Sequence, residues 1–305
     1  MCGIVGILGN NEAAPILVDA LKKLEYRGYD SAGIATINNG ILERRRETGK
    51  LVNLADKLVH QPLKGKAGIG HTRWATHGSP SVINAQPHKA GKVAVVHNGI
   101  IENFKALRDE LKSDGAKFET ETDTETVVQL CMQFLDNGKT PIQAVEKTIA
   151  RLEGAYALCF LFECDENLLI AARKGSPLAV GHGNGEMFVG SDAIALAPMT
   201  NKVTYLEEGD YAVITREKLE IRDINGTVTK REMKTLMLSA QNVQKGTYKH
   251  FMAKEIFEQP SVLSNAINYN LNSDSDQVAM PDLDLDFNKI NNITMVACGT
   301  AFLAC

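Results

Sequence analysis

Short strand-like apolar runs alternate irregularly with amphipathic helical patterns along this chain, as far as about Asp223. They lack the regular strand–helix–strand rhythm and the glycine fingerprint of a dinucleotide-binding fold. Asn39-Gly40 stands between apolar runs at 34–37 and 41–46, which is typical of a tight β-hairpin. Hairpin-linked strands with helices between them predict an α+β fold, in which mostly antiparallel sheets are covered by helices.

Hydrophobic periodicity locates the individual elements. Strands are predicted at 2–8, 67–71, 93–97, 155–162, 168–172, 178–180 and 211–215. Helices are predicted at 13–24, with Pro15 in the first turn, and at 104–111, 124–135 and 142–152.

The pattern weakens after Asp223, and the residues that follow are interpreted as a boundary between domains. We assign residues 1–240 to one domain, 241–249 to a polar linker and 250–305 to a second piece. That piece contains a predicted helix at 248–259, ended by Pro260, an acidic stretch at 273–286 and one apolar strand at 293–297. One strand without a partner sheet is below the size that folds unaided, so we expect poor order there.

Composition excludes several classes of partner. Lys and Arg number 33 against 37 Asp and Glu, a net charge of -4, which predicts neither nucleic acid nor a membrane as partner. The basic run at 44–46 is interpreted as solvated surface. No signal peptide and no apolar run of about 20 residues are seen. Six cysteines without a C-x-x-C pair favour a reducing cytoplasm.

Metal ligands and cofactor motifs are also missing from the pattern. The seven histidines are scattered, and none stands in an H-x-x-x-H or H-E-x-x-H arrangement. We therefore predict no metal and no cofactor.

The cysteine at position 2 offers a specific chemistry. Once Met1 is removed, thiol and free α-amine share one residue, and an α-amine with an ordinary pKa of about 7.7 to 8.0 can serve as the general base for that thiol. The position alone also fits a small buried hydrophobe on an apolar strand, which is the commoner role of a free cysteine. Longer motifs are needed to decide between these roles.

Several blocks of sequence favour the nucleophile. In order along the chain they are CGIVG at 2–6, LEYRGYDSAG at 24–33, GHTRWATHG at 70–78, VVHNGIIEN at 95–103, ETDTE at 121–125, EGAYAL at 153–158, YLEEGD at 205–210 and KEIFEQP at 254–260. The set resembles the class II, N-terminal-nucleophile glutamine amidotransferases, and its wording is most similar to the glucosamine-6-phosphate synthase branch. This resemblance implies a four-layer αββα sandwich in which Cys2 attacks L-glutamine and releases glutamate and ammonia.

The resemblance also implies a role for each block. Glutamine would be bound by Arg73 through its carboxylate and by Asp123 through its ammonium group, with further contacts from Thr76 and His77. The guanidinium fork of Arg73 suits a carboxylate. Asp123, taken alone, would also fit a helix N-cap.

The remaining motif residues would surround the nucleophile. Asn98 and Gly99, whose dipeptide alone is a turn signal, would form the oxyanion hole at the end of a strand. Arg27 and Gly28 would lie beside the nucleophile. Trp74, as a lone tryptophan most often a core residue, would gate the passage of ammonia.

Two substitutions depart from the family pattern. Gln86 stands where a histidine is common, so we assign it no acid–base role. Ala301 stands where the family has a serine, directly after Cys298, Gly299 and Thr300, and the resemblance implies that these three residues are a remnant of a sugar-phosphate site.

By the same resemblance, residues 250–305 would be the truncated start of an α/β sugar-isomerase domain. Fructose 6-phosphate would then be a substrate of the full-length enzyme only, which would be a homodimer, and this chain alone would be a glutaminase. Two other hypotheses stay open: a catalytically silent binding module, and another branch of the class II amidotransferases.

Overall fold

The computed structural model describes residues 2–236, 246–272, 277–278, 286, 289–297 and 299–305. Contacts divide the chain into two units, Met1–Gln244 and Lys245–Cys305. The predicted linker at 241–249 and acidic stretch at 273–286 lie largely outside the described residues, so our domain boundaries stay predictions.

Two antiparallel sheets form the centre of the first unit. The first contains β1 (Gly3–Leu8), β2 (Ser31–Asn38), β3 (Ile41–Thr48), β4 (Ala67–Arg73), β9 (Ala179–His182), β10 (Met187–Gly190), β11 (Lys202–Tyr205) and β15 (Met233–Thr235), in the order β15-β11-β9-β10-β1-β4-β2-β3. The second contains β5 (His88–Ala90), β6 (Val93–Ile101), β7 (Gly154–Phe162), β8 (Asp165–Lys174), β12 (Tyr211–Ile214), β13 (Leu219–Arg222) and β14 (Val228–Thr229), in the order β14-β13-β12-β8-β7-β6-β5. Every predicted strand of this unit is confirmed, with ends that differ by a few residues.

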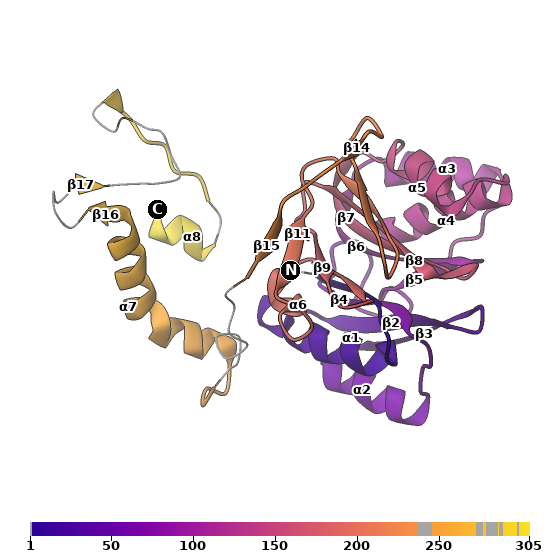
Figure 1. The fold of residues 1–305 in the computed structure, drawn as a ribbon, viewed down its shortest axis with the longest axis horizontal. Coiled ribbons are helices and arrows are strands. Elements are labelled where there is room, and N and C mark those ends of the chain that lie inside the picture. Colours follow the sequence, from indigo (N-terminus) through magenta and orange to yellow (C-terminus); the bar gives the residue numbers. More distant parts are fainter. Residues whose placement is uncertain (1, 237–245, 273–276, 279–285, 287–288, 298) are drawn as a thin grey trace. The chain divides into compact units, whose positions relative to one another are not determined.

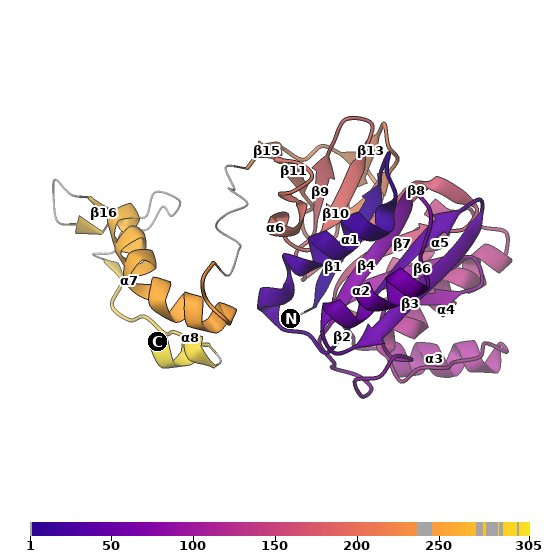
Figure 2. The same cartoon turned by 90° about the horizontal axis from the view of Figure 1, so that it is seen from below.

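Helices cover the outer face of each sheet (Figures 1 and 2). α1 (Ala13–Lys22), α2 (Leu51–His60) and the short α6 (Ala193–Leu196) pack on the first sheet. α3 (Phe104–Ser113), α4 (Asp123–Asp136) and α5 (Pro141–Ile149) pack on the second. The four-layer αββα sandwich is therefore confirmed, although α2 was not predicted.

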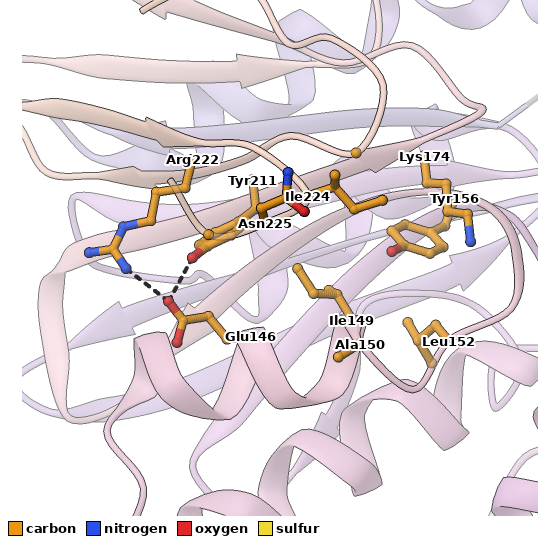
Figure 3. A pocket seen from close by; sticks show the side chains of 12 residues that line it. Glu146, Ile149, Ala150, Leu152, Tyr156, Lys174, Tyr211, Arg222, Ile224 and Asn225 are labelled. Carbon is orange, nitrogen blue, oxygen red and sulfur yellow. Dashed lines mark hydrogen bonds and ion pairs between the residues drawn. The ribbon is translucent and has the colours of Figure 1, made fainter. Parts of the chain in front are cut away.

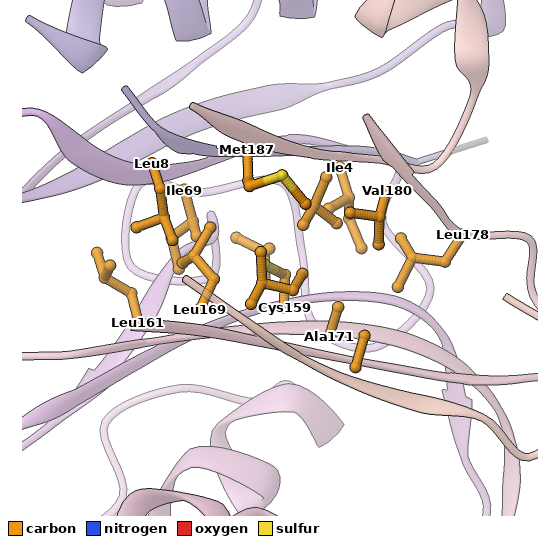
Figure 4. Packing of buried hydrophobic residues seen from close by; sticks show 14 of the residues in the cluster. Ile4, Leu8, Ile69, Cys159, Leu161, Leu169, Ala171, Leu178, Val180 and Met187 are labelled. Carbon is orange, nitrogen blue, oxygen red and sulfur yellow. The ribbon is translucent and has the colours of Figure 1, made fainter. Parts of the chain in front are cut away.

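The core between the two sheets is apolar. Figure 4 shows Ile4, Ile69 and Met187 of the first sheet meeting Cys159 and Leu169 of the second. A fully buried Ile or Leu contributes about 1.5 to 3 kcal/mol, so this layer holds the sheets together strongly.

The alternation of side chains along β4 and β6 extends this core into a polar corner. Because Ile69 faces the second sheet, His71 and Arg73 face it too, since side chains of a strand alternate with period two. Val96 on β6 faces the first sheet, and so does Asn98. The polar side chains thus converge where the apolar layer ends.

The β2–β3 hairpin has the predicted turn. Asn38 pairs with Ile41, and Asn39 and Gly40 adopt φ values of 52° and 73°. Positive φ at both central residues defines the tight turn that Asn-Gly favours.

The basic run on β3 is not solvated surface, which corrects that interpretation. Arg44, Arg45 and Arg46 are only partly exposed. Arg44 donates to Pro87 O at 3.2 Å, and Arg46 donates to Ala85 O at 2.9 Å. Guanidinium groups can bind several backbone carbonyls at once, so these side chains fasten the segment before β5 to the first sheet.

The second unit contains α7 (Phe251–Asn270), β16 (Leu271–Asn272), β17 (Gln277–Val278) and α8 (Thr300–Ala304). The predicted helix end before Pro260 is wrong, because α7 continues through Pro260 and its ribbon bends along its length (Figure 1). A proline removes one backbone bond and can leave a kink, and Ser261 Oγ donates to Glu258 O at 2.8 Å beside it.

The predicted strand at 293–297 is also wrong. These residues form no strand, and Ile293 and Val296 are 73% and 90% exposed. An extended apolar run needs a partner for its backbone groups, and the pairings described for this unit join only β16 and β17.

Candidate active site

Cys2 lies directly before β1, which pairs with β4 on one side and β10 on the other. Its half-buried thiol accepts a hydrogen bond from the Trp74 N–H at 3.2 Å, and Sγ also lies 3.5 Å from Trp74 O. Cys2 is therefore supported by a central strand and by the segment that follows β4.

The environment of Cys2 favours the neutral thiol. Burial raises the pKa of Cys2 and outweighs the Trp74 N–H and the Arg73 charge, which lower it. The nearby carboxylate of Asp30 raises it further. Attack by this sulfur at neutral pH thus requires a base.

The carbonyl oxygen of Cys2 accepts bonds from two predicted site residues. Arg27 Nη1 lies 3.4 Å from it and Asn98 Nδ2 lies 3.2 Å from it. Arg27, at the end of the 3-10 turn η1 (Glu25–Arg27), is held by Asp192 at 2.5 Å, and Asp192 also accepts from Tyr26 at 2.7 Å. Sequence reasoning missed Asp192, which is distant in the chain and precedes only the short α6.

Gly28 and Trp74 lie together beside this group. Gly28 has a φ of 75°, and a Cβ there would stand 2.9 Å from the Trp74 ring. Trp74 is 52% exposed, so the expectation of a core tryptophan is wrong. Its indole therefore covers Gly28.

Arg73 is buried, and its side chain is 4% exposed. The guanidinium donates to three carbonyls of the following loop: His77 O at 2.5 Å, Gly78 O at 2.9 Å and Ser79 O at 3.4 Å. Asp30, which sequence reasoning missed, lies 3.9 Å from Nη1 and accepts from Ala75 N at 2.5 Å. Arg73 therefore shapes this loop in addition to lying near Cys2.

Asp123 is the first residue of α4, and the N-cap is Thr122, whose hydroxyl accepts from Glu125 N. The N-cap interpretation of Asp123 is therefore wrong. The Asp123 carboxylate accepts from Ile101 N at 2.9 Å and Thr124 N at 3.0 Å, and only 5% of this side chain is exposed.

Two loop residues lie between Arg73 and Asp123. His77 Nδ1 is 4.0 Å from Asp123 Oδ1, and the His77 ring packs edge-on against Phe104 at 4.9 Å. Thr76 is exposed and precedes it in the same loop. His77 thus accepts a bond from the Arg73 guanidinium through its carbonyl oxygen, and its ring lies near the Asp123 carboxylate.

Asn98 and Gly99 do not end a strand, because β6 continues to Ile101 and pairs Gly99 with Tyr156 of β7. Gly99 has a φ of 131°, and a Cβ there would stand 2.0 Å from Ala155 O. Glycine is thus required inside the strand, where its unusual backbone conformation replaces the predicted turn.

Gln86 supports this strand. Its amide accepts from His97 N at 2.6 Å and donates to His97 O at 3.2 Å and Thr124 Oγ1 at 3.2 Å. These contacts hold the backbone just before Asn98 and join it to the start of α4.

The predicted sugar-phosphate remnant belongs to the second unit. Cys298 lies outside the described residues, Gly299 has a φ of 61° and precedes α8, and Thr300 is the first residue of that helix.

A separate cavity of about 600 Å³ lies between α5 and the second sheet (Figure 3). On its wall Glu146 accepts from Tyr211 at 2.6 Å and from Arg222 at 3.0 Å. None of the predicted site residues lines it.

Over the part of the chain that the structure describes, no three His, Cys, Asp or Glu side chains are grouped so as to hold a metal ion. Over the same part, no helix has the length and apolar character needed to cross a membrane.

Comparison with known proteins first defines the class. Residues 71–198 match the model of a glutamine amidotransferase domain. The fold is similar to a glutamine phosphoribosylpyrophosphate amidotransferase from B. subtilis, with a TM-score of 0.65 and 27% identity over 75% of this chain and 50% of that one. An allosteric regulatory enzyme of purine biosynthesis gives a TM-score of 0.63 and 28% identity over 73% and 49%. The chain therefore contains a glutamine amidotransferase domain, and its fold is that of the N-terminal-nucleophile amidotransferases.

Within that class, the chain is similar along its whole length to glutamine–fructose-6-phosphate aminotransferases (isomerizing). It is 56% identical to the protein of Brucella abortus over 304 residues and 54% identical to that of Zymomonas mobilis. Each match covers all of this chain and 50% of the relative. The chain therefore spans about half the length of the curated relatives it matches.

Proposed function

We propose that this chain hydrolyses L-glutamine to glutamate and ammonia through a thioester on Cys2. The observation that carries the proposal is the convergence of a half-buried thiol, a guanidinium and a strand-borne amide within one corner of the sandwich. The glutamine amidotransferase family of residues 71–198 supports the same chemistry.

The first step is attack by sulfur on the side-chain amide carbon of glutamine. The raised thiol pKa means that a base must take the proton, and among the described hydrogen bonds Cys2 Sγ contacts only the Trp74 backbone. The α-amine of Cys2 itself is then the base, as in other N-terminal nucleophiles. This chemistry requires that Met1 be removed.

Negative charge develops on the amide oxygen of the tetrahedral intermediate. Asn98 Nδ2 carries two hydrogens, of which one is engaged with Cys2 O, and the other can point to the oxyanion together with the Gly99 N–H. A single such donor contributes about 3 to 4 kcal/mol. Collapse of the intermediate breaks the C–N bond, the protonated amine returns its proton to the leaving nitrogen, and ammonia departs. Water then hydrolyses the thioester to glutamate.

Capture of glutamine involves the residues around His77. Its carboxylate would bind Arg73, replacing one of the loop carbonyls that this guanidinium now holds, because a charge-assisted bond is about twice as strong as a neutral one. Its ammonium group would bind the Asp123 carboxylate, with Thr76 and His77 adding polar contacts.

The longer relatives suggest a destination for the ammonia. In a full-length protein it would convert fructose 6-phosphate to glucosamine 6-phosphate, with Trp74 gating its passage and Cys298, Gly299 and Thr300 contributing to the sugar-phosphate site. Such an enzyme would be a cytoplasmic homodimer. A reducing compartment suits Cys2, and the described cysteines are all free.

The experiment measures glutamate and ammonia from purified chain, with and without fructose 6-phosphate, beside a Cys2→Ala variant. Equal amounts of both products, abolished by Cys2→Ala, support a glutaminase. A folded wild-type chain of verified N-terminus that makes neither product refutes it and favours the silent binding module.

A further inference from the structure

His71 is a buried side chain that the proposed mechanism has not yet used. It lies on β4, two residues before Arg73, and reaches across to β6 of the other sheet. Its Nε2 lies 2.9 Å from Asn98 Oδ1 and 3.0 Å from His97 O. A single ring nitrogen therefore contacts the side chain of one residue and the backbone of its neighbour.

The two partners determine which nitrogen carries the proton. A backbone carbonyl can only accept, so Nε2 must donate, and the Asn98 atom that shares this N–H must be its oxygen. With Oδ1 held in this way, Nδ2 faces Cys2 O at 3.2 Å. A flipped amide would set NH2 against the imidazole N–H and oxygen against the Cys2 carbonyl, two repulsive contacts.

We propose that His71 is a positioning residue that fixes the orientation of the Asn98 amide, so that its N–H hydrogens face the nucleophile. This inference rests on the proposed role of Asn98 in glutamine hydrolysis. His71 does not touch substrate, and it acts only through Asn98.

The charge and surroundings of His71 suit this role. Burial lowers the pKa of His71 to about 3, against the opposing effect of the Asn98 bond, so the ring is neutral at any pH of interest. Nδ1 has no hydrogen-bond partner in the part of the chain that the structure describes, as an unprotonated nitrogen allows. The ring is thus a fixed donor rather than an acid–base group.

The His97 carbonyl oxygen accepts hydrogen bonds from two side chains, so His71 can be replaced without leaving that oxygen unpaired. Gln86 Nε2 also donates to that carbonyl at 3.2 Å, so His71→Leu leaves only Asn98 Oδ1 without its donor. His71→Gln keeps an N–H close to the position of Nε2. His182→Leu is the matched control, because His182 Nε2 also makes one side-chain bond, to Thr204 at 2.9 Å, away from Cys2.

Steady-state glutamine hydrolysis provides the first test. We expect His71→Leu to lower kcat about 10- to 100-fold with an unchanged KM. Removing one oxyanion donor lowers kcat by about 10²- to 10³-fold, and a misoriented Asn98 amide should show part of that loss. His71→Gln should recover most of kcat, and His182→Leu should match wild type. An unchanged kcat in folded His71→Leu, or equal losses in the Leu and Gln variants, would overturn the proposal.

A double-mutant cycle separates positioning from simple packing. In an Asn98→Ala background, His71→Leu should lower kcat no further, because the amide that it orients is absent. The same loss in both backgrounds would mean that His71 acts on packing alone and would overturn the proposal.

A measurement without turnover keeps this test independent of the proposed function. ¹⁵N NMR of the His71 ring in the intact chain should show the neutral Nε2–H tautomer from pH 5 to 8. The Nδ1–H tautomer would overturn the proposal even in an active enzyme. In Asn98→Ala the Nε2–H keeps only His97 O as its partner, so the ¹⁵N signal of Nε2 should shift. If the chain hydrolyses no glutamine but shows the Nε2–H tautomer and this shift, the proposed function fails and the His71–Asn98 contact stands.

Discussion

Replacing Gly99 by alanine tests whether the backbone at this position stabilises the oxyanion. The added Cβ would stand 2.0 Å from Ala155 O, about 1.4 Å short of ordinary contact, and also 2.9 Å from Tyr156 Cα. Both neighbours are backbone atoms of β7, so relief requires β6 to move away by about 1 Å. A displacement of that size at a reacting centre costs roughly 10²-fold in rate.

The same substitution strains the backbone. A φ of 131° is rarely adopted by residues with a side chain, and holding alanine there costs about 1 to 3 kcal/mol. We therefore expect Gly99→Ala to lose about 2 kcal/mol of unfolding free energy and about 10²-fold in kcat, with a smaller change in KM.

Gly138→Ala is the matched control. Gly138 also has a positive φ, 76°, but a Cβ there would meet nothing within 4 Å. It should lose about 1 kcal/mol of stability and keep wild-type kcat. Urea unfolding and initial rates of glutamate release measure both quantities. A wild-type kcat in Gly99→Ala would refute the assignment of its N–H to the oxyanion hole.

Three further outcomes follow from the site. Arg73→Lys keeps the charge but loses the planar fork and two of the loop contacts. The value of kcat/KM for glutamine should therefore fall at least about tenfold. A wild-type kcat/KM would show that Arg73 does not bind the substrate. Because burial raises the pKa of Cys2, its alkylation by iodoacetamide should accelerate as the pH rises through 9, and a plateau near pH 7 would contradict the buried thiol. Burial raises the pKa of Asp192, but bonds from Tyr26, Ile194 and Arg27 outweigh it and lower that pKa overall. The Asp192 carboxylate therefore stabilises the fold at pH values above 3.8, its pKa in the unfolded chain, and this stabilisation is lost as the pH falls through the lower folded pKa. Asp192→Asn should weaken the acid dependence of Tm. An unchanged acid profile would count against the ion pair.

The sequence predicted the sandwich because its strong signals are local. Apolar runs identified the longer strands of both sheets, whereas the sequence analysis did not predict β5, β10, β11, β13, β14 and β15, which are two to four residues long. Asn39-Gly40 identified one turn whose conformation the two residues dictate. The motif blocks identified Cys2 and Asn98, which the structure brings within hydrogen-bond distance of each other. Period-two alternation along β4 could also have shown that His71 and Arg73 share one face, a signal that sequence reasoning did not use.

What the sequence did not predict depends on long-range contacts. Asp192 reaches Arg27 across 165 residues, and no local pattern signals that pair. Arg73 already donates hydrogen bonds to the backbone carbonyls of its own loop, whereas its residue type suggested only a substrate carboxylate as its partner. The helix through Pro260 shows the opposite error, because a local breaker was overruled by good helical sequence on both sides.

The free α-amine of Cys2 is the central claim, and one measurement tests it directly. Glutamine hydrolysis is compared between protein whose intact mass shows Cys2 as the first residue and the same chain shown by mass to retain Met1. A peptide bond to Met1 turns the basic amine into a non-basic amide, so the account predicts at least about a 100-fold lower kcat for the retained form, in line with the value of a general base. Equal rates in the two forms would contradict the proposed mechanism.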